Sequence, residues 1–127
     1  MMLWLWVAMG GALGACARFA VAQVVPINLH SAQFPWPTLT VNIVGSFLIG
    51  LLVGALSTSA WFNDFGRAFL VTGVLGGFTT FSAFSLEVVQ MAQMGHTAVA
   101  AGYVVSSLVL CLLGAFLGLL LGANFSG

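Results

Sequence analysis

The amino-acid sequence predicts an all-α membrane protein with four transmembrane helices, the third of them broken near the membrane midplane. Two observations lead to this fold class. Hydrophobic residues make up 61% of the 127 residues and charged residues only 3%, whereas about a quarter of the residues in a soluble domain are charged. Four stretches are also long and apolar enough to cross the hydrocarbon core as helices, which takes about 20 residues each.

The four predicted spans cover residues 3–25, 38–56, 68–94 and 97–121. The joints between them are short and hold proline and small polar residues, which interrupt helical runs. We therefore expect one four-helix transmembrane domain, residues 1–127, with both termini on the same side of the membrane. The joints leave no soluble module and the sequence has no charge pattern suited to nucleic acid, so neither an enzyme nor a nucleic-acid-binding protein is expected.

Small residues recur at helix-packing spacing in the first, second and last spans. Glycines four residues apart let two helices approach closely in lipid. In the first span, Leu13-Gly14-Ala15-Cys16 also resembles a bacterial lipoprotein attachment site. Cleavage before Cys16 is the less favoured alternative, because the apolar run continues past that point. Cys16 and Cys111 both fall within spans and are expected to act as small hydrophobes rather than as a disulfide.

The basic residues give the chain no clear orientation in the membrane. An excess of lysine and arginine in flanking loops sets topology. Here Arg67 lies at the joint between the second and third spans, whereas Arg18 lies in the half of the first span nearest the opposite face. A chain so balanced can insert either way round, and two oppositely inserted copies can pair about a two-fold axis in the membrane plane. The alternative is a fixed orientation set by one loop.

Polar residues gather in one half of the predicted bundle, on the side reached by the ends of the first and third spans. At 1.5 Å per helical residue, Arg18 and Glu87 each lie roughly 10 Å inside that face. The other polar residues of this half come from the starts of the second and fourth spans: Thr40, Asn42, Tyr103, Ser106 and Ser107. Charges at such depth mark pathways or partnered sites, so Arg18 and Glu87 either take part in transport or neutralise each other.

The stretch GVLGGFTTFSAFSLE, residues 73–87, is the reason for expecting a break in the third helix. Its three glycines, followed by Thr79 and Thr80, form a poor helix and fall near the middle of the span. Unwound backbone at membrane depth is tolerated where it is buried in protein or lines a cavity. Its free carbonyls commonly coordinate a cation.

Two phenylalanines follow the expected break. Phe81 and Phe84 lie three residues apart on one helical face, and Ser82 and Ser85 occupy the adjacent face. Phenylalanines in a membrane helix most often pack in the core or face lipid. These two share a half-membrane with Asn42 and several hydroxyls, and a phenyl ring has a positive edge that can face an anion.

Three ordered stretches carry a family resemblance: GGALGACARF at 10–19, TLTVNIVGSFLIG at 38–50 and GVLGGFTTFSAFSLE at 73–87. With the length and four-span layout, they resemble the small bacterial fluoride channels of the Fluc (CrcB) family over nearly the whole chain. The last span matches by layout more than by motif, and Ala83 stands where many relatives carry threonine. The resemblance implies an antiparallel dual-topology homodimer with two pores in the lipid of the bacterial inner membrane. It also implies passive fluoride export, which lowers cytoplasmic fluoride and gives fluoride resistance.

The resemblance also implies roles for individual residues. Phe81 and Phe84 would line the fluoride path with their ring edges, and Asn42 would donate hydrogen bonds to the rings or to fluoride. The other pathway residues that the resemblance implies are Arg18, Glu87, Tyr103 and Ser107. Of these, Arg18 would draw anions to the vestibule, Tyr103 and Ser107 would form a polar track opposite the rings, and Glu87 would be a helper without an assigned role. Thr40 is added to the expected pathway from its depth in the membrane, and Ser82 from its place beside the two rings.

A structural sodium ion is expected at the centre of such a dimer. The broken helices of two oppositely inserted copies would face each other at the two-fold axis. Carbonyls of Gly76 and Thr79 from both copies would then surround one point, and these partial negative charges repel unless a cation sits between them. The alternative is a packing kink whose carbonyls bond to neighbouring hydroxyls.

Two other functions compete with a fluoride channel. A small multidrug transporter also has four helices and dual topology, but such proteins carry a membrane glutamate in the first helix, where this chain has Arg18 and no acid. An assembly subunit without transport would explain the glycine faces but not the polar cluster. An enzyme is not supported, since His30 and His96 lie in joints far apart in sequence. The choice of fluoride over other small anions comes from the resemblance alone.

Overall fold

The computed structural model describes residues 2–24 and 27–126 and contains no strand in these ranges. Four helical segments are long and apolar enough to cross a membrane, which confirms the predicted four-span fold class and indicates a multi-pass membrane protein. Their bounds are α1 (Met2–Val24), α2 (Trp36–Leu56), Phe62–Gln93 and α5 (Thr97–Ala123). Val25, the expected end of the first span, lies outside the described residues, as does Pro26.

The third span begins at Phe62 rather than at residue 68, the largest difference from the predicted bounds. Its first turns carry Asp64 and Arg67, which are both exposed. The sequence prediction started the span after Arg67, the second of these charged residues. The end of a membrane helix can, however, carry charged residues where it leaves the hydrocarbon. The sequence pattern therefore placed the start of this helix too late.

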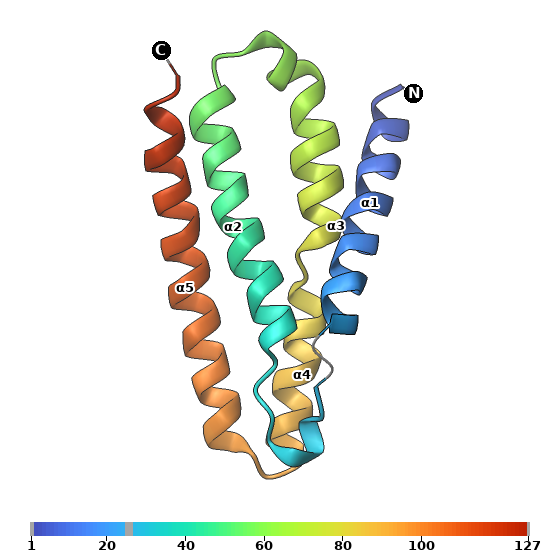
Figure 1. Ribbon diagram of the computed structural model, residues 1–127, viewed down its shortest axis with the longest axis vertical. Helices are drawn as coiled ribbons and strands as arrows, with labels where there is room; N and C mark the ends of the chain where they lie inside the picture. Colours follow the sequence, from blue (N-terminus) through green and yellow to red (C-terminus); the bar gives the residue numbers. More distant parts are fainter. Residues whose placement is uncertain (1, 25–26, 127) are drawn as a thin grey trace.

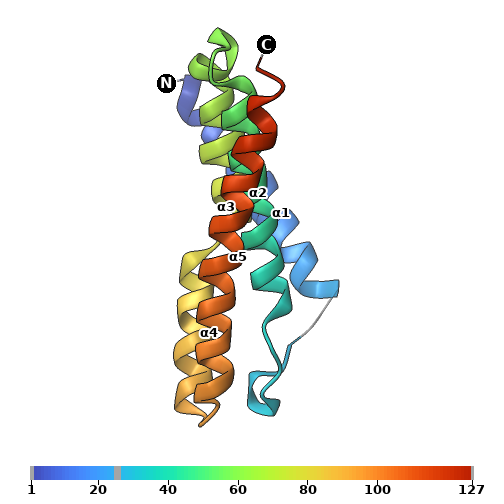
Figure 2. The same cartoon turned by 90° about the vertical axis from the view of Figure 1, so that its left-hand side faces the viewer.

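The helices are arranged as two close pairs, α2 with α5 and α1 with the first half of the third span (Figure 1). Both termini lie at the same end of the molecule, as the even number of spans requires. At the opposite end are the short helical turn η1 (Leu29–Ser31) and the joint between the third and fourth spans. In Figure 2 the C-terminal end of α1 turns away from the second half of the third span.

Glycine contacts hold the α2–α5 pair together and set its register. A Cβ atom built at Gly54 would lie 2.9 Å from the Ala123 nitrogen, and one at Gly122 would lie 2.8 Å from the Ala55 nitrogen. Because these glycines have no side chain, the two backbones approach closely and gain dispersion contacts, which stabilise helix association in lipid. The two helices run in the same direction, both starting at the end that holds η1.

A second glycine seam joins α1 to the third span. A Cβ atom at Gly10 would lie 2.9 Å from the Val74 nitrogen, and one at Gly77 would lie 3.1 Å from the Ala15 nitrogen. The glycine spacing in the sequence therefore predicted the two packing faces correctly. Any side chain at these positions would force the helices apart.

The third span consists of three helical pieces. η2 (Phe62–Leu75) is wound as a π-helix, and at its end the Gly76 amide donates to the Val71 carbonyl, five residues back. α3 (Gly76–Phe78) adds one turn, after which Thr79 (φ −82°, ψ 158°) and Thr80 (φ −152°, ψ 119°) are extended. α4 (Phe81–Gln93) then begins with Thr80 as its N-cap.

Capping explains where α4 starts and ends. The Thr80 hydroxyl accepts a hydrogen bond from the Ala83 amide (3.1 Å), which satisfies one of the free donors of the first helical turn. At the other end Gly95 adopts φ +86°, and the His96 amide donates to the Met91 carbonyl at 2.8 Å. Glycine in this left-handed conformation is the usual way to end a helix.

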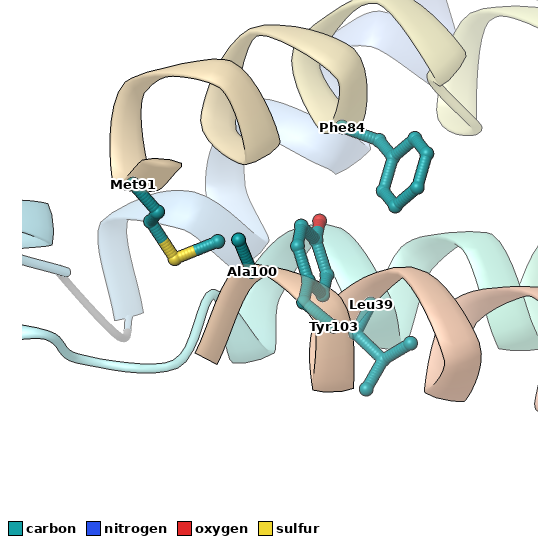
Figure 3. Packing of buried hydrophobic residues seen from close by; sticks show 5 residues of the cluster. All are labelled: Leu39, Phe84, Met91, Ala100 and Tyr103. Atoms are coloured by element: carbon teal, nitrogen blue, oxygen red, sulfur yellow. The ribbon is translucent and has the colours of Figure 1, made fainter. Parts of the chain in front are cut away.

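A small hydrophobic core lies where α4 meets α5 and the start of α2 (Figure 3). It consists of Leu39, Phe84, Met91, Ala100 and Tyr103, all of them buried. The Phe84 ring packs against the Tyr103 ring with centroids 5.0 Å apart and planes at 62°. This core fixes α4 against α5 directly below the extended residues.

Candidate functional site

The break in the third span is bridged from α2 by the side chain of Asn42. Its Nδ2 donates to the Thr80 carbonyl (2.9 Å), and its Oδ1 accepts from the Thr80 amide (2.8 Å). The amide side chain thus pairs with both backbone groups of one extended residue, as a neighbouring strand would. Backbone groups without helical partners are costly in an apolar environment, so Asn42 stabilises the extended conformation.

Other polar groups at the break also have partners. The Arg18 Nε–H donates to the Gly77 carbonyl (3.1 Å), which links α1 to the last turn before the break. The Thr79 hydroxyl donates to the Leu75 carbonyl at 2.9 Å. In an uninterrupted helix the Thr80 amide would bond to the Gly76 carbonyl and the Ala83 amide to the Thr79 carbonyl. Both amides donate elsewhere, so these two carbonyls are released from the helical pattern.

A cavity of about 390 Å³ adjoins the break, between α2, the third span and α5. Its polar lining comes from residues of all three elements: Asn42, Ser46, Thr79, Thr80 and Ser107. Ser107 is only 7% exposed, and among the described residues its hydroxyl has no hydrogen-bond partner. A buried hydroxyl without a partner is costly, so Ser107 is a candidate ligand-binding residue at the cavity wall.

Phe81 and Phe84 both line this cavity but differ in their surroundings. Phe84 is 8% exposed and packs edge-on against Tyr103, whereas Phe81 is 76% exposed. The two ring centroids are 5.5 Å apart, with the planes tilted by 41°. Phe84 is therefore fixed by the core, while Phe81 lies at the cavity edge on an uncovered face of the protomer.

Glu87 holds two hydroxyl groups from two other helices. The Thr38 hydroxyl donates to Oε1 and the Tyr103 hydroxyl to Oε2, each at 2.7 Å. Glu87 and Arg18 line a second, smaller cavity of about 180 Å³ together with Thr38 and Thr80. No ion pair joins Arg18 to Glu87 in the described part of the chain: the Arg18 Nε–H bonds to the Gly77 carbonyl, and Glu87 accepts from the two hydroxyls.

The structure brings most of the expected site residues together around the two cavities. The larger cavity contains Asn42, Gly76, Thr79, Phe81, Phe84 and Ser107. The smaller contains Arg18 and Glu87, and Tyr103 connects the two through its contacts with Phe84 and Glu87. Thr40 and Ser82 are exposed and line neither cavity. The Ser82 hydroxyl lies 3.3 Å from that of Thr80.

The sequence analysis did not assign Thr38 or Ser46 to the site. Both are one helical turn from Asn42, at positions 38, 42 and 46, and residues four apart lie on the same helical face. Thr40 is only two residues from Asn42 and therefore points to a different face. Helical periodicity along this span would have selected Thr38 and Ser46 in place of Thr40.

The sequence was compared with protein families and with known proteins, and it is similar to both a family and individual relatives. The model of the family described as CrcB-like protein, Camphor Resistance (CrcB), matches residues 5–119. A protein of Agrobacterium fabrum named fluoride-specific ion channel FluC is 50% identical over 118 residues, or 93% of this chain and 94% of that protein. Proteins of the same name from Opitutus terrae and Helicobacter pylori (strain G27) are 46% and 41% identical, covering 93% and 98% of this chain and 90% and 96% of the relatives.

Proposed function

Because the chain belongs to the CrcB-like protein family and its relatives are named fluoride-specific ion channels, we propose that it is a fluoride channel and not an enzyme. We further propose that it conducts passively and, in the bacterial inner membrane, lets fluoride leave the cytoplasm. The observation that carries the proposal is the larger cavity, where an amide, several hydroxyls and two phenyl rings meet at an interrupted helix.

The chemistry of this lining suits a small, strongly hydrated anion. A selective filter replaces the hydration shell of its ion with groups of the protein. The buried Ser107 hydroxyl has a hydrogen to donate. Asn42 uses one of its two N–H bonds on the Thr80 carbonyl, which leaves the other for an ion. The positive edges of Phe81 and Phe84 add attraction without adding a fixed charge.

Arg18 and Glu87 act in this proposal mainly by positioning. Glu87 holds the Tyr103 hydroxyl, and the Tyr103 ring in turn fixes Phe84 at the cavity wall. Arg18 bonds the Gly77 carbonyl and so supports the end of α3. Its positive charge, inside the smaller cavity, also favours entry of an anion from that side.

We propose that the working unit is an antiparallel homodimer of two oppositely inserted copies in the lipid bilayer. Phe81 is 76% exposed and Gly76 is exposed beside it on the cavity side, where a second copy can cover them. The near balance of Arg18 and Arg67 across the spans allows both insertions. Two cavities would then give two parallel fluoride paths through one dimer.

We also propose one structural sodium ion on the two-fold axis of that dimer, at a break that lies near the membrane midplane. The supporting observation is that the carbonyls of Gly76 and Thr79 are released from helical bonding. Two copies supply four such oxygens. Carbonyl oxygens at breaks of membrane helices are ligands suited to sodium, and the ion would offset their mutual repulsion.

Efflux from liposomes tests passive conduction directly. A channel moves net charge, so fluoride should leave the liposomes only when an ionophore such as valinomycin lets potassium follow. Cotransport of fluoride with protons moves no net charge, so it would release fluoride without the ionophore and would contradict the proposal. Transport of an aromatic cation instead of fluoride would identify the chain as a multidrug-type transporter.

A further inference from the structure

Cys111 lies on the wall of the larger cavity, although its sequence context suggested only a small hydrophobe. It is partly buried on α5, one helical turn beyond Ser107. The register of the α2–α5 pair shows which residue of α2 lies at the same level as Cys111. A Cβ atom at Gly114 would lie 3.4 Å from the Ile43 carbonyl and 3.6 Å from the Phe47 amide. Cys111 is three residues earlier, about 4.5 Å lower along the axis, which places it level with Asn42.

A second observation indicates that this wall is a candidate ligand site. Ser107 is more than nine-tenths buried, lines the same cavity and has a hydroxyl without a hydrogen-bond partner among the described residues. Residues four apart on a helix share one face, so the Cys111 thiol continues the face that presents this hydroxyl. The thiol is therefore next to a donor that is free to bind the permeating ion.

We propose that the Cys111 thiol is a binding site for a soft, thiophilic metal ion inside the ion path, and that mercury(II) bound there blocks the channel. The inference rests on the proposed function, because block is meaningful only if the cavity conducts. Thiolate sulfur is a preferred ligand of soft metal ions. With mercuric chloride the S–H bond breaks and an S–Hg bond forms, one chloride ion leaves, and the proton passes to the buffer without any redox change.

Cys16 provides a matched control on α1. It is exposed, and it lines neither cavity. Mercury bound to Cys16 therefore leaves the cavity open. Fluoride efflux is measured with and without mercuric chloride for the wild type, Cys16→Ser, Cys111→Ser and Cys111→Ala, each compared with its own untreated rate.

The expected result is a loss of at least about tenfold in efflux for the wild type and Cys16→Ser, since an occluded filter cannot replace the hydration of the ion. Dithiothreitol should restore the rate by removing the metal. The Cys111 variants should change by less than about twofold, because no thiol remains at the cavity wall. Unchanged wild-type efflux, or equal block of both Cys111 variants, would overturn the inference.

A labelling experiment on the wild type tests whether mercury binds Cys111 and does not require the variants to fold. The reconstituted protein is treated with mercuric chloride, denatured and alkylated, and the Cys111 peptide is read by mass spectrometry. Mercury should protect Cys111 from alkylation, and an unprotected Cys111 would overturn the inference. If the untreated wild type releases no fluoride, the channel proposal itself fails, while this labelling still decides whether the cavity thiol binds the metal.

Discussion

Replacing Asn42 with leucine should remove the support of the broken helix while keeping a side chain of similar size. Asn42 makes two hydrogen bonds, of 2.9 and 2.8 Å, to the carbonyl and amide of Thr80. An ordinary hydrogen bond contributes about 0.5–1.5 kcal/mol to stability. The two part-buried bonds together therefore stabilise the extended conformation by about 1–3 kcal/mol, which the leucine variant loses.

This free energy sets the expected loss of conduction. If the extended conformation is the conducting one, about 2 kcal/mol lowers its relative population by about 30-fold. Fluoride efflux of Asn42→Leu should therefore fall by up to about that factor, and its thermal unfolding midpoint in detergent should fall as well. Val44→Leu is the matched control, because Val44 lies on the same helix but is exposed and lines neither cavity.

The assay is fluoride efflux from liposomes, recorded with a fluoride electrode and normalised to folded protein. Val44→Leu should retain wild-type efflux and stability, since it changes an exposed apolar side chain only. The efflux rate of Asn42→Leu could instead stay within about twofold of the wild-type rate, and its unfolding midpoint within about 2 °C of the wild-type midpoint. In that case the hydrogen bonds from Asn42 to Thr80 contribute too little to support the break. The positioning role of Asn42 would then be refuted.

Four further predictions test other parts of the account. Gly14→Ala places a Cβ against the Val74 carbonyl and 2.7 Å from the Phe78 amide, so it should cost about 1–3 kcal/mol in unfolding measurements. Gly11→Ala, whose Cβ meets nothing within 4 Å, should be neutral, and equal effects would refute the α1 seam. Phe84→Ile should lower both efflux and thermal stability because Phe84 packs on Tyr103, whereas Phe81→Ile should lower efflux alone. Normal efflux in both variants would mean that the two rings only pack and do not contact the ion. Several lysines added to one joint should lock the orientation and abolish efflux until the oppositely locked variant is co-expressed, and full activity of one locked variant would exclude the antiparallel dimer. Exhaustive replacement of sodium by a large organic cation should weaken the dimer and efflux, and no change in either would exclude the central ion.

Local residue preferences predicted the position of the break. Glycine and threonine disfavour a helix wherever they occur, and the extended residues Thr79 and Thr80 lie where that preference placed the interruption. The π winding of η2 was not predicted, because helix propensities rank residues without giving the number of residues per turn. Glycine spacing predicted both helix seams for a different reason, because glycines four residues apart let two backbones approach closely.

The partners of the charged residues could not be read from the sequence. Depth along the helices placed Arg18 and Glu87 at the same level, which allowed an ion pair. The pairing depends instead on how α1 diverges from α4, and this angle leaves Arg18 at the Gly77 carbonyl and Glu87 at two hydroxyls. Thr40 was predicted from its depth in the membrane alone, and the face of the helix on which it lies was not considered. The structure places it on an exposed face away from both cavities.

The most direct test of the channel proposal is a single efflux experiment on liposomes loaded with equal concentrations of fluoride and chloride. Both ions are followed with selective electrodes after valinomycin is added to wild-type proteoliposomes. A cavity lined by Asn42, Ser107 and two phenyl edges should empty the liposomes of fluoride while chloride remains inside. Release of chloride at the same rate as fluoride would contradict the account.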